Sequence, residues 1–396
     1  MTDKDKKNKR QGKYLKRILI KGLGNEKWQA ITIPLSSILL SLIAASIVIL
    51  ILGKNPLGAF HNLLQGAGIM PKPSYAGYKS MLTDFMTLLD GMTPLLFASL
   101  AVAIGLRGGL FNIGVSGQML LAGYSATVLV GYSDLPAPIA IPLVIVVGIL
   151  AGALLGGLVG LLKYKFNINE VVSTIMFNYI VQYILSFFIH SYYIDPVSRQ
   201  SRYINETSRL TLTNVEIAGL KMDLSFGILL GIVLAICLKV FLDKTRTGFE
   251  INIVGSNPKA AKYAGISVGK TMILTMILSG AFAGLAGVTY YLGYFSSIQP
   301  RVLSSTGFDA VAVALLGNSN PLGIIAASFI ISIIDKGSTY MSSISGIRHE
   351  IASVITGLIL LFSACGAYIK YKVGIGKDKL AYELRKEADE YGNSDN

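Results

Sequence analysis

The sequence is poor in the residues that build metal sites and disulfide frameworks. Its 396 residues include only two cysteines, three histidines and one tryptophan. The histidines (His61, His190 and His349) lie far apart and show no ligand spacing, so we expect no metal site. Cys237 and Cys365 each lie within a long apolar run, which argues against a disulfide framework. No cofactor is predicted.

Charge is also scarce, and its scarcity excludes a water-soluble protein. Only 14% of the residues are charged, whereas a soluble globular chain carries about 25%. In contrast, 52% are hydrophobic and the mean hydropathy is +0.58. Lysine and arginine number 35 and aspartate and glutamate 22, a net charge of +13. In a membrane protein this excess indicates basic cytoplasmic loops rather than nucleic-acid binding. We therefore predict an integral membrane protein with lipid, and no nucleic acid, as its partner.

The apolar runs predict an all-α protein with about ten transmembrane helical segments. The first, Ala30–Leu52, carries no charge and follows ten basic residues, which favours a retained anchor with a cytoplasmic N-terminus over a signal peptide. The other predicted spans are Met92–Leu106, Leu110–Gly131, Pro138–Leu162, Val171–His190, Ser225–Leu242, Thr271–Tyr294, Phe308–Gly317, Leu322–Asp335 and Glu350–Tyr371.

Two of these spans form a helix that is broken near the C-terminus. A single span over 308–336 would leave the C-terminal lysines outside, whereas a break at Asn318–Pro321 returns the C-terminus to the cytoplasm. A broken helix at membrane depth occurs where it lines a cavity or is buried in protein. The resulting organisation is a transmembrane domain at 30–371, cytoplasmic tails at 1–29 and 372–396, a cytoplasmic loop at about 243–270 and an external loop at about 191–224.

Glycines recur at a four-residue spacing in two spans. Such a spacing lets the backbones of two membrane helices approach closely. We favour packing inside the bundle, and a subunit interface is the alternative. The residues are Gly148, Gly152, Gly156 and Gly160 in one span, and Gly280 and Gly284 in the other.

Uncharged amides lie in apolar surroundings at two places. Asn112 and Gln118 belong to a glycine-rich stretch at 107–118 that offers amide and hydroxyl groups to a neutral polar solute; the alternative is a helix cap formed by Asn112 and Ser116. Asn178 and Gln182 lie four residues apart on one helical face. Amides in such positions hydrogen-bond between helices or line a pathway.

The sequence shows no catalytic grouping, and no acidic pair of the kind that proton-coupled transporters use. We expect Asp309 at the N-terminus of a helix, and Asp335 at an aqueous boundary beside Lys336. The segment Gly265–Thr271 resembles a P-loop but has three residues between its glycines where four are required. We therefore expect no catalytic residues and no nucleotide-binding motif.

A short helix is predicted at Asn257–Gly265, between two spans. Asn257 can cap it, Pro258 fits its first turn and Gly265 can end it. This helix would be either a docking element for a partner or an ordinary solvated loop helix.

Four motifs occur in order along the chain: Gly109–Gly114 with Gly117–Met119, Asn169–Met176 with Asn178 and Tyr179, Gly255–Ala261 with Tyr263–Ile266, and Phe308–Gly317 with Asn320–Gly323. Together they resemble ABC importer permeases of the ribose, galactose and nucleoside class, which Bmp-type binding lipoproteins serve. The resemblance covers nearly the whole chain beyond the N-terminal tail. Ser116 departs from the pattern, because many relatives have Glu there, and we assign this position no charged role.

The resemblance implies a multi-pass permease subunit of the bacterial plasma membrane that performs no ATP chemistry itself. It implies two cytoplasmic ATP-binding subunits, a second permease subunit (homologous or identical) and an extracellular substrate-binding lipoprotein. The motifs favour a nucleoside as the solute; a simple-sugar permease and an ion-coupled secondary transporter are the alternatives. The expected pathway residues are Asn112, Gln118, Asn178 and Gln182, and the expected residues of the ATPase coupling loop are Asn257, Pro258, Ala260, Ala261 and Gly265.

Overall fold

The computed structural model describes residues 29–365 except Ala218 and His349, and in addition Tyr368, Lys372, Gly374 and Ile375. The predicted tails at 1–29 and 372–396 lie almost wholly outside the described residues. Two compact units divide the chain, one formed by residues 49–356 and the other by residues 1–48 with 357–396. In the second unit the Ser37 hydroxyl donates a hydrogen bond of 3.2 Å to the Phe362 carbonyl.

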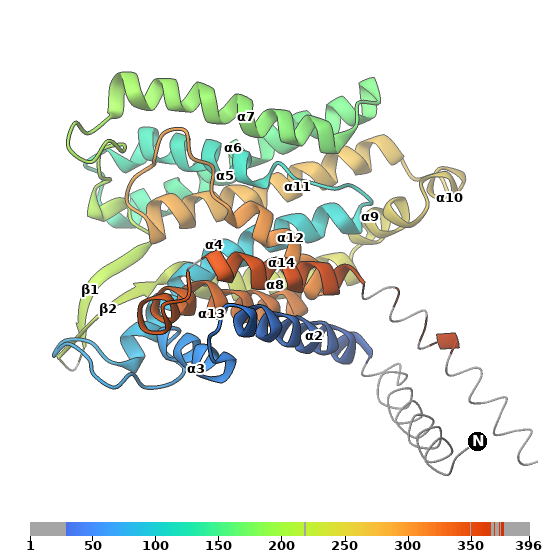
Figure 1. The fold of residues 1–396 in the computed structure, drawn as a ribbon. Coiled ribbons are helices and arrows are strands. Elements are labelled where there is room, and N and C mark those ends of the chain that lie inside the picture. Colours follow the sequence, from blue (N-terminus) through green and yellow to red (C-terminus); the bar gives the residue numbers. More distant parts are fainter. Residues whose placement is uncertain are drawn as a thin grey trace, which may run out of the picture. The chain divides into compact units, whose positions relative to one another are not determined.

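The described residues are mostly helical, as the sequence predicts (Figure 1). Three helices end in a π-helical turn, and one short 3-10 turn, η3 (Glu206–Ser208), lies in the predicted external loop. The π-helical turns are η1 (Thr127–Gly131), η2 (Ile189–Tyr193) and η4 (Tyr290–Tyr294). The α-helices are α2 (Gln29–Ile51), α3 (Pro56–Gly66), α4 (Met81–Arg107), α5 (Val115–Ala126), α6 (Ala137–Phe166), α7 (Glu170–Phe188), α8 (Phe226–Lys244), α9 (Arg246–Ser256), α10 (Pro258–Tyr263), α11 (Val268–Thr289), α12 (Thr306–Leu316), α13 (Pro321–Ser345) and α14 (Glu350–Ala364).

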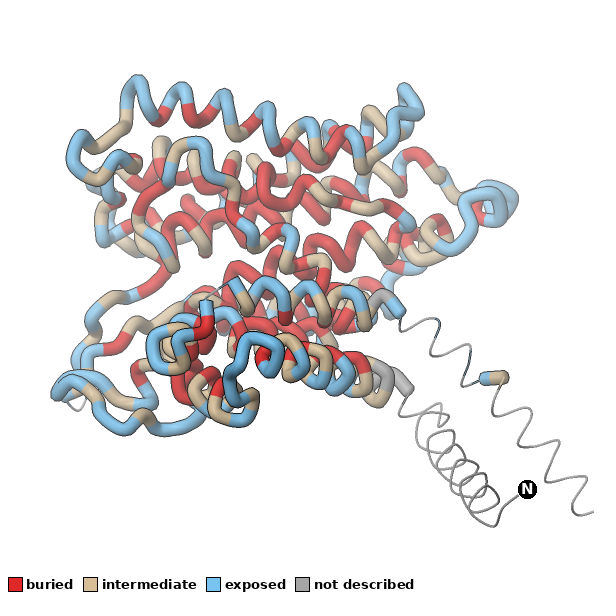
Figure 2. Tube along the Cα trace, viewed as in Figure 1, coloured by how far each residue is buried: buried red, intermediate tan, exposed pale blue. Residues whose placement is uncertain are grey.

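Among the described residues, seven helices are long and apolar enough to cross a membrane, and three shorter apolar helices accompany them. This agrees with the prediction of about ten segments. The helices α4 and α11 form the centre of the larger unit and are buried along most of their length, whereas α6, α7 and α8 expose large apolar side chains (Figure 2). Those exposed apolar faces suit contact with lipid.

The sequence did not predict the strands in the external loop. Strands β1 (Thr211–Ile217) and β2 (Leu220–Ser225) form an antiparallel hairpin whose turn includes Gly219 at a positive φ of 77°. The hairpin is anchored to the helices, because the Thr211 hydroxyl donates a hydrogen bond of 2.7 Å to the carboxylate of Asp90 in α4. Helix α4 also begins eleven residues before the predicted Met92, where Ser80 and Thr83 form a capping box.

The predicted break near the C-terminus is present. Helix α12 ends at Leu316, the turn residues Asn318 and Ser319 both have positive φ, and the Asn320 side chain caps α13 by accepting a hydrogen bond from the Leu322 amide. The second piece is longer than predicted, since α13 continues to Ser345. Asp335 and Lys336 therefore lie within a long helix and not near its end.

The glycine spacing reflects close packing of α6 against α11 inside the chain. A methyl group added at Gly152 would overlap the Gly280 carbonyl and lie 2.8 Å from the Gly284 Cα. One added at Gly156 would lie 3.0 Å from the Gly280 Cα. The two helix backbones thus touch along this line, which confirms the favoured interpretation of packing inside the bundle.

Candidate functional site

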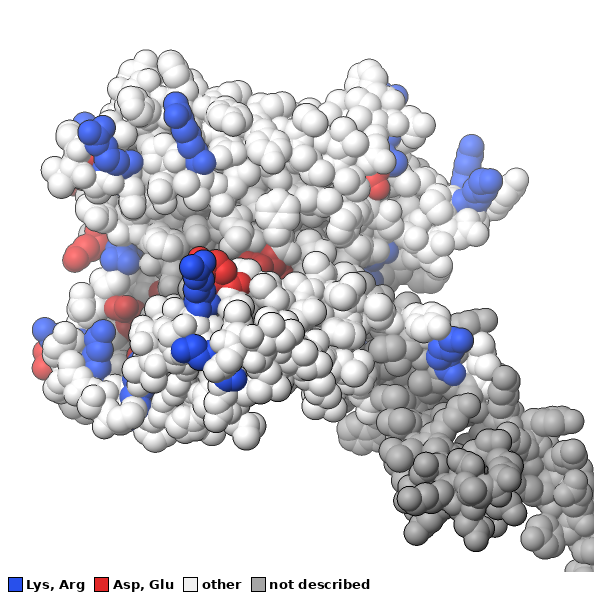
Figure 3. Space-filling view, viewed as in Figure 1, with Lys and Arg blue, Asp and Glu red and all other residues white. Residues whose placement is uncertain are grey.

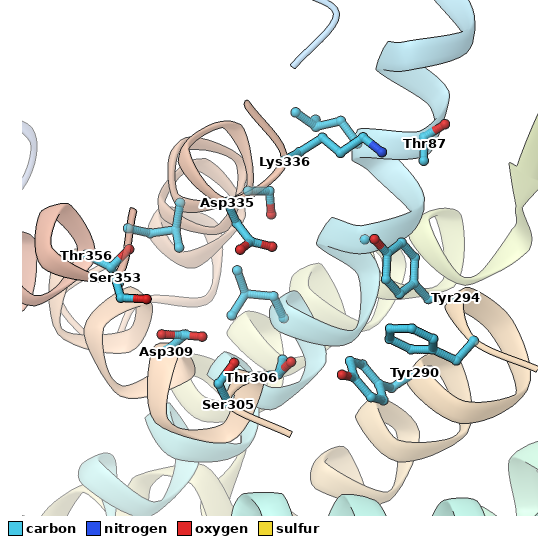
Figure 4. Close-up of a pocket in the computed structure, with 16 residues that line it drawn as sticks. Thr87, Tyr290, Tyr294, Ser305, Thr306, Asp309, Asp335, Lys336, Ser353 and Thr356 are labelled. Carbon is cyan, nitrogen blue, oxygen red and sulfur yellow. The ribbon is translucent and has the colours of Figure 1, made fainter. Parts of the chain in front are cut away.

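A cavity of about 320 Å³ lies within the larger unit, among α4, α12, α13, α14 and the end of α11 (Figure 4). Its volume falls at the lower end of the ~300–1,000 Å³ typical of small-molecule sites. Polar side chains from these helices face the space, and Figure 3 shows acidic atoms beside basic ones near the middle of this face. The cavity is therefore polar, although its helices are apolar.

Two carboxylates belong to this cavity. Asp309 lies in the first turn of α12 and accepts a hydrogen bond from the Ser305 side chain. Asp335 lies on α13, and Figure 4 shows both carboxyl groups facing the same space. The sequence reasoning missed this pair because the two residues are 26 positions apart on separate helices. The expectation that the membrane segments contain no acidic pair was wrong.

Aromatic rings form the opposite wall of the cavity. Tyr290 and Tyr294 lie on η4, and Phe295 follows directly. The Phe295 ring centroid is 4.9 Å from each of the two tyrosine rings. Figure 4 shows the phenol groups pointing toward the side of the carboxylates. In the sequence this aromatic run has an ambiguous meaning, because tyrosines are also common where a membrane helix meets the interface.

The short helix α10 and the η4 wall of the cavity lie at opposite ends of α11. Helix α11 starts at Val268, five residues after α10, and runs with η4 for 27 residues to Tyr294. At 1.5 Å per residue this is about 40 Å of helix. The hairpin lies at the η4 end of α11, since the amide of Leu210, directly before β1, donates a hydrogen bond of 3.0 Å to the Leu292 carbonyl in η4. Figure 1 shows the hairpin and α10 on opposite sides.

Three of the four predicted pathway amides form one buried cluster near the start of α5. Asn112 donates to the Gln118 side chain at 3.0 Å and to the Ser279 hydroxyl at 2.8 Å. Asn178 accepts from the Gly117 amide at 2.8 Å and donates to the Ile113 carbonyl at 3.0 Å. Both asparagines therefore use donor and acceptor groups to hold the backbone between α4 and α5.

Gln182 lies apart from this cluster, and its amide donates to the Arg301 carbonyl at 2.6 Å. Arg301 belongs to the segment that leads into α12. Ser116 also holds this segment, because its hydroxyl donates to the Ser304 carbonyl at 2.9 Å. The four amides do not line the cavity. Together with Ser116, they fix the segments behind its wall.

The predicted helix in the 243–270 loop is present as α10. The Asn257 side chain accepts hydrogen bonds of 3.1 Å from the amides of Lys259 and Ala260, Pro258 is the first helical residue, and Gly265 follows the helix with φ of 77°. Ala261 is fully buried. The sequence reasoning did not single out Tyr263, which is 96% exposed at the tip of this helix.

Arg107 connects three segments at the α10 end of the larger unit. Its guanidinium donates to the Ser319 carbonyl at 3.0 Å, between α12 and α13, and to the Asn252 side chain at 3.4 Å in α9. Beside it, a methyl group at Gly109 would lie 2.9 Å from the Gly255 Cα. The end of α4 is thus in direct contact with the last turn of α9, next to α10.

Known proteins resemble the chain over most of its length. The family described as "Branched-chain amino acid transport system / permease component" matches residues 85–364. The nucleoside ABC transporter permease protein NupB of Lactococcus lactis is 33% identical over 92% of this chain and 99% of its own. The guanosine ABC transporter permease protein NupP of Bacillus subtilis is 34% identical over 88% and 97%. The glucose ABC transporter permease protein TsgB13 of Haloferax volcanii is 27% identical over 89% and 92%.

These matches agree with the resemblance found in the four sequence motifs. With its apolar helices, the chain is a multi-pass protein of the bacterial plasma membrane. Since the family match spans well over half of the chain and two relatives above 30% identity are covered almost end to end, the chain belongs to the branched-chain amino acid transport system permease component family and is an ABC transporter permease.

Proposed function

We propose that the protein is the permease subunit of an ABC importer for nucleosides. The observation that carries the proposal is the similarity, over nearly the full length, to two permeases named for nucleosides and for guanosine. The polar cavity with its tyrosine and phenylalanine rings supports the same conclusion, because a nucleoside combines a flat base with a hydroxyl-rich sugar.

The partners in this proposal are two cytoplasmic ATPase subunits, a second permease subunit and an extracellular binding lipoprotein. The docking element for an ATPase is α10 with the coupling residues Asn257, Pro258, Ala260, Ala261 and Gly265. Its capped geometry and the protruding Tyr263 support this role, since exposed aromatic side chains often anchor protein interfaces. Arg107 offers a direct link from α9, beside α10, to the turn between α12 and α13.

The proposed orientation places the α10 end in the cytoplasm, with both termini, and the hairpin outside. The charges support it, because Lys259 and Lys262 lie on α10 and Lys244 and Arg246 lie on the segment before it. The hairpin strands instead mix Glu216 and Lys221, as an external loop tolerates. In this orientation the cavity lies toward the side where a binding protein delivers its solute.

We retain Asn112, Gln118, Asn178 and Gln182 as pathway residues of this proposal. The positions of these side chains support the assignment. Gln182 hydrogen-bonds Arg301 on the segment that leads to α12, and Asn178 and Asn112 hydrogen-bond backbone amides at the start of α5. Gln118 adds a buried amide nitrogen without a hydrogen-bond partner among the described residues, so it retains a donor for another group.

The test is purification of the full chain together with its ATPase subunits, followed by measurement of which solute stimulates ATP hydrolysis and uptake. We expect uridine or guanosine to be transported. The docking role is tested by Tyr263→Ala, which should release the ATPase, whereas Tyr203→Ala should not. Tyr203 is a matched control because it is 64% exposed but lies in the predicted external loop. Retention of the ATPase by the Tyr263 variant would count against α10 as the docking element.

A simple-sugar permease is the second candidate, favoured by the 27% identity to the glucose permease protein of Haloferax volcanii. Competition for uptake among uridine, guanosine and ribose separates the two. A complex that transports ribose and ignores both nucleosides would replace the proposed substrate class.

A further inference from the structure

We propose that the cavity of Asp309, Asp335, Tyr290 and Tyr294 is a solute site of the permease itself, which recognises the neighbouring hydroxyl groups of a ribonucleoside. This inference rests on the proposed function and adds to it the part of the solute that the permease reads. The four side chains come from three elements, α12, α13 and η4, and meet only in the folded chain (Figure 4).

Carboxylates select the hydroxyl groups of a solute because an ionised carboxyl group accepts hydrogen bonds and donates none. Two of them facing one small space can accept from two adjacent hydroxyl groups. Bonds of this charge-assisted kind are roughly twice as strong as neutral ones. The same charges disfavour an anionic solute, although Lys336 also borders the cavity. The site therefore fits a neutral solute with a vicinal diol and excludes its phosphate esters.

The tyrosine wall provides the complementary surface for a flat ring. Tyr290 and Tyr294 lie 6.4 Å apart between ring centroids at an angle of 38°. Aromatic faces stack on nucleobases with little dependence on the base. A solute held at one end by its hydroxyl groups and at the other by its ring would thus span the cavity from the carboxylates to the tyrosines.

Ser332 supplies an independent sign of a missing ligand. It borders the cavity on α13, is 95% buried, and its hydroxyl has no hydrogen-bond partner among the described residues. Buried hydroxyl groups in the neighbouring helix behave differently, since Ser99 in α4 donates to the carbonyl four residues earlier. A buried polar group without a partner is costly and uncommon. A solute hydroxyl in the cavity would satisfy it.

The experiment compares the uptake of uridine with that of 2′,3′-dideoxyuridine by the complete complex in proteoliposomes, with the same binding protein throughout. Because the binding protein is unchanged, a difference between variants in the ratio of the two uptake rates reports on the permease. We expect Asp309→Asn to lower uridine uptake about tenfold and dideoxyuridine uptake less than twofold, which matches the loss of one charge-assisted hydrogen bond.

Asp243→Asn is the matched control, because Asp243 pairs with Lys239 at the other end of the larger unit and should leave the ratio unchanged. Ser332→Ala provides a milder variant should Asp309→Asn not accumulate in the membrane, and it should lower uridine uptake more than dideoxyuridine uptake. Equal loss of both solutes in these variants, an unchanged ratio, or inhibition of uridine uptake by uridine 5′-monophosphate as strong as by uridine would overturn the inference. A wild-type complex that transports no nucleoside would instead refute the proposed function.

Discussion

The contact between α6 and α11 gives the most direct test of the packing, through the substitution Gly152→Ala. The added methyl group would overlap the Gly280 carbonyl and lie 2.8 Å from the Gly284 Cα, whereas ordinary contacts begin at 3.4 Å. The helices must therefore separate by about 0.6 Å or more at this point. A gap of ~0.5–1 Å already removes a quarter to a half of the dispersion energy of the atoms concerned.

The expected cost follows from the absence of a hydrophobic driving force between helices in lipid, where close van der Waals packing holds them together. Overpacking of a tight contact costs about 1–3 kcal/mol. Replacing glycine by alanine also stabilises a helix by up to ~1 kcal/mol through its higher helix propensity. The control variant must therefore have the same gain in helix propensity without the steric clash. Gly58→Ala in α3 is suitable, because the nearest atom to its added methyl group is 3.9 Å away.

The assay is the thermal midpoint of the full chain purified in detergent, read from its monodisperse fraction after heating. We expect Gly152→Ala to unfold several degrees below Gly58→Ala, and Gly152→Val to unfold lower still. If Gly152→Ala has the same thermal midpoint as the control but a changed oligomeric state, the glycines form a subunit interface, and the assignment of close packing within the chain is wrong.

Three further predictions concern coupling and the buried amides. Arg107→Gln should leave ATP hydrolysis intact but lower uptake per ATP about fivefold or more, because it loses its bond to Ser319; unchanged stoichiometry would contradict this. Asn178→Ala should lower the thermal midpoint by leaving a buried backbone amide unpaired, at a cost of about 1–3 kcal/mol, and Gln182→Ala should lower it less; an equal effect would refute the difference. Ala261→Leu should reduce co-purification of the ATPase, since the fully buried Ala261 has no room for a larger side chain; a normal yield would disprove it.

Local signals predicted the parts of the fold that depend on neighbouring residues. The cap at Asn257, the break at Asn318–Pro321 and the glycine spacing around Gly152 all followed from short-range chemistry, and the structure contains each of them. The hairpin at Thr211–Ser225 was missed because its strands are short and lie in a loop that membrane topology alone treats as a connection.

The amino-acid sequence was sufficient to identify a helical membrane protein, because apolar runs and the uneven distribution of basic residues act along the chain. It also identified the permease family from motifs in a fixed order. The polar cavity, in contrast, is visible only in the folded chain. Asp309, Asp335 and Tyr290 each have an ordinary local explanation, as a helix-end charge, a boundary charge and an interfacial ring. Their shared cavity arises from packing between α11, α12 and α13, which no local pattern encodes.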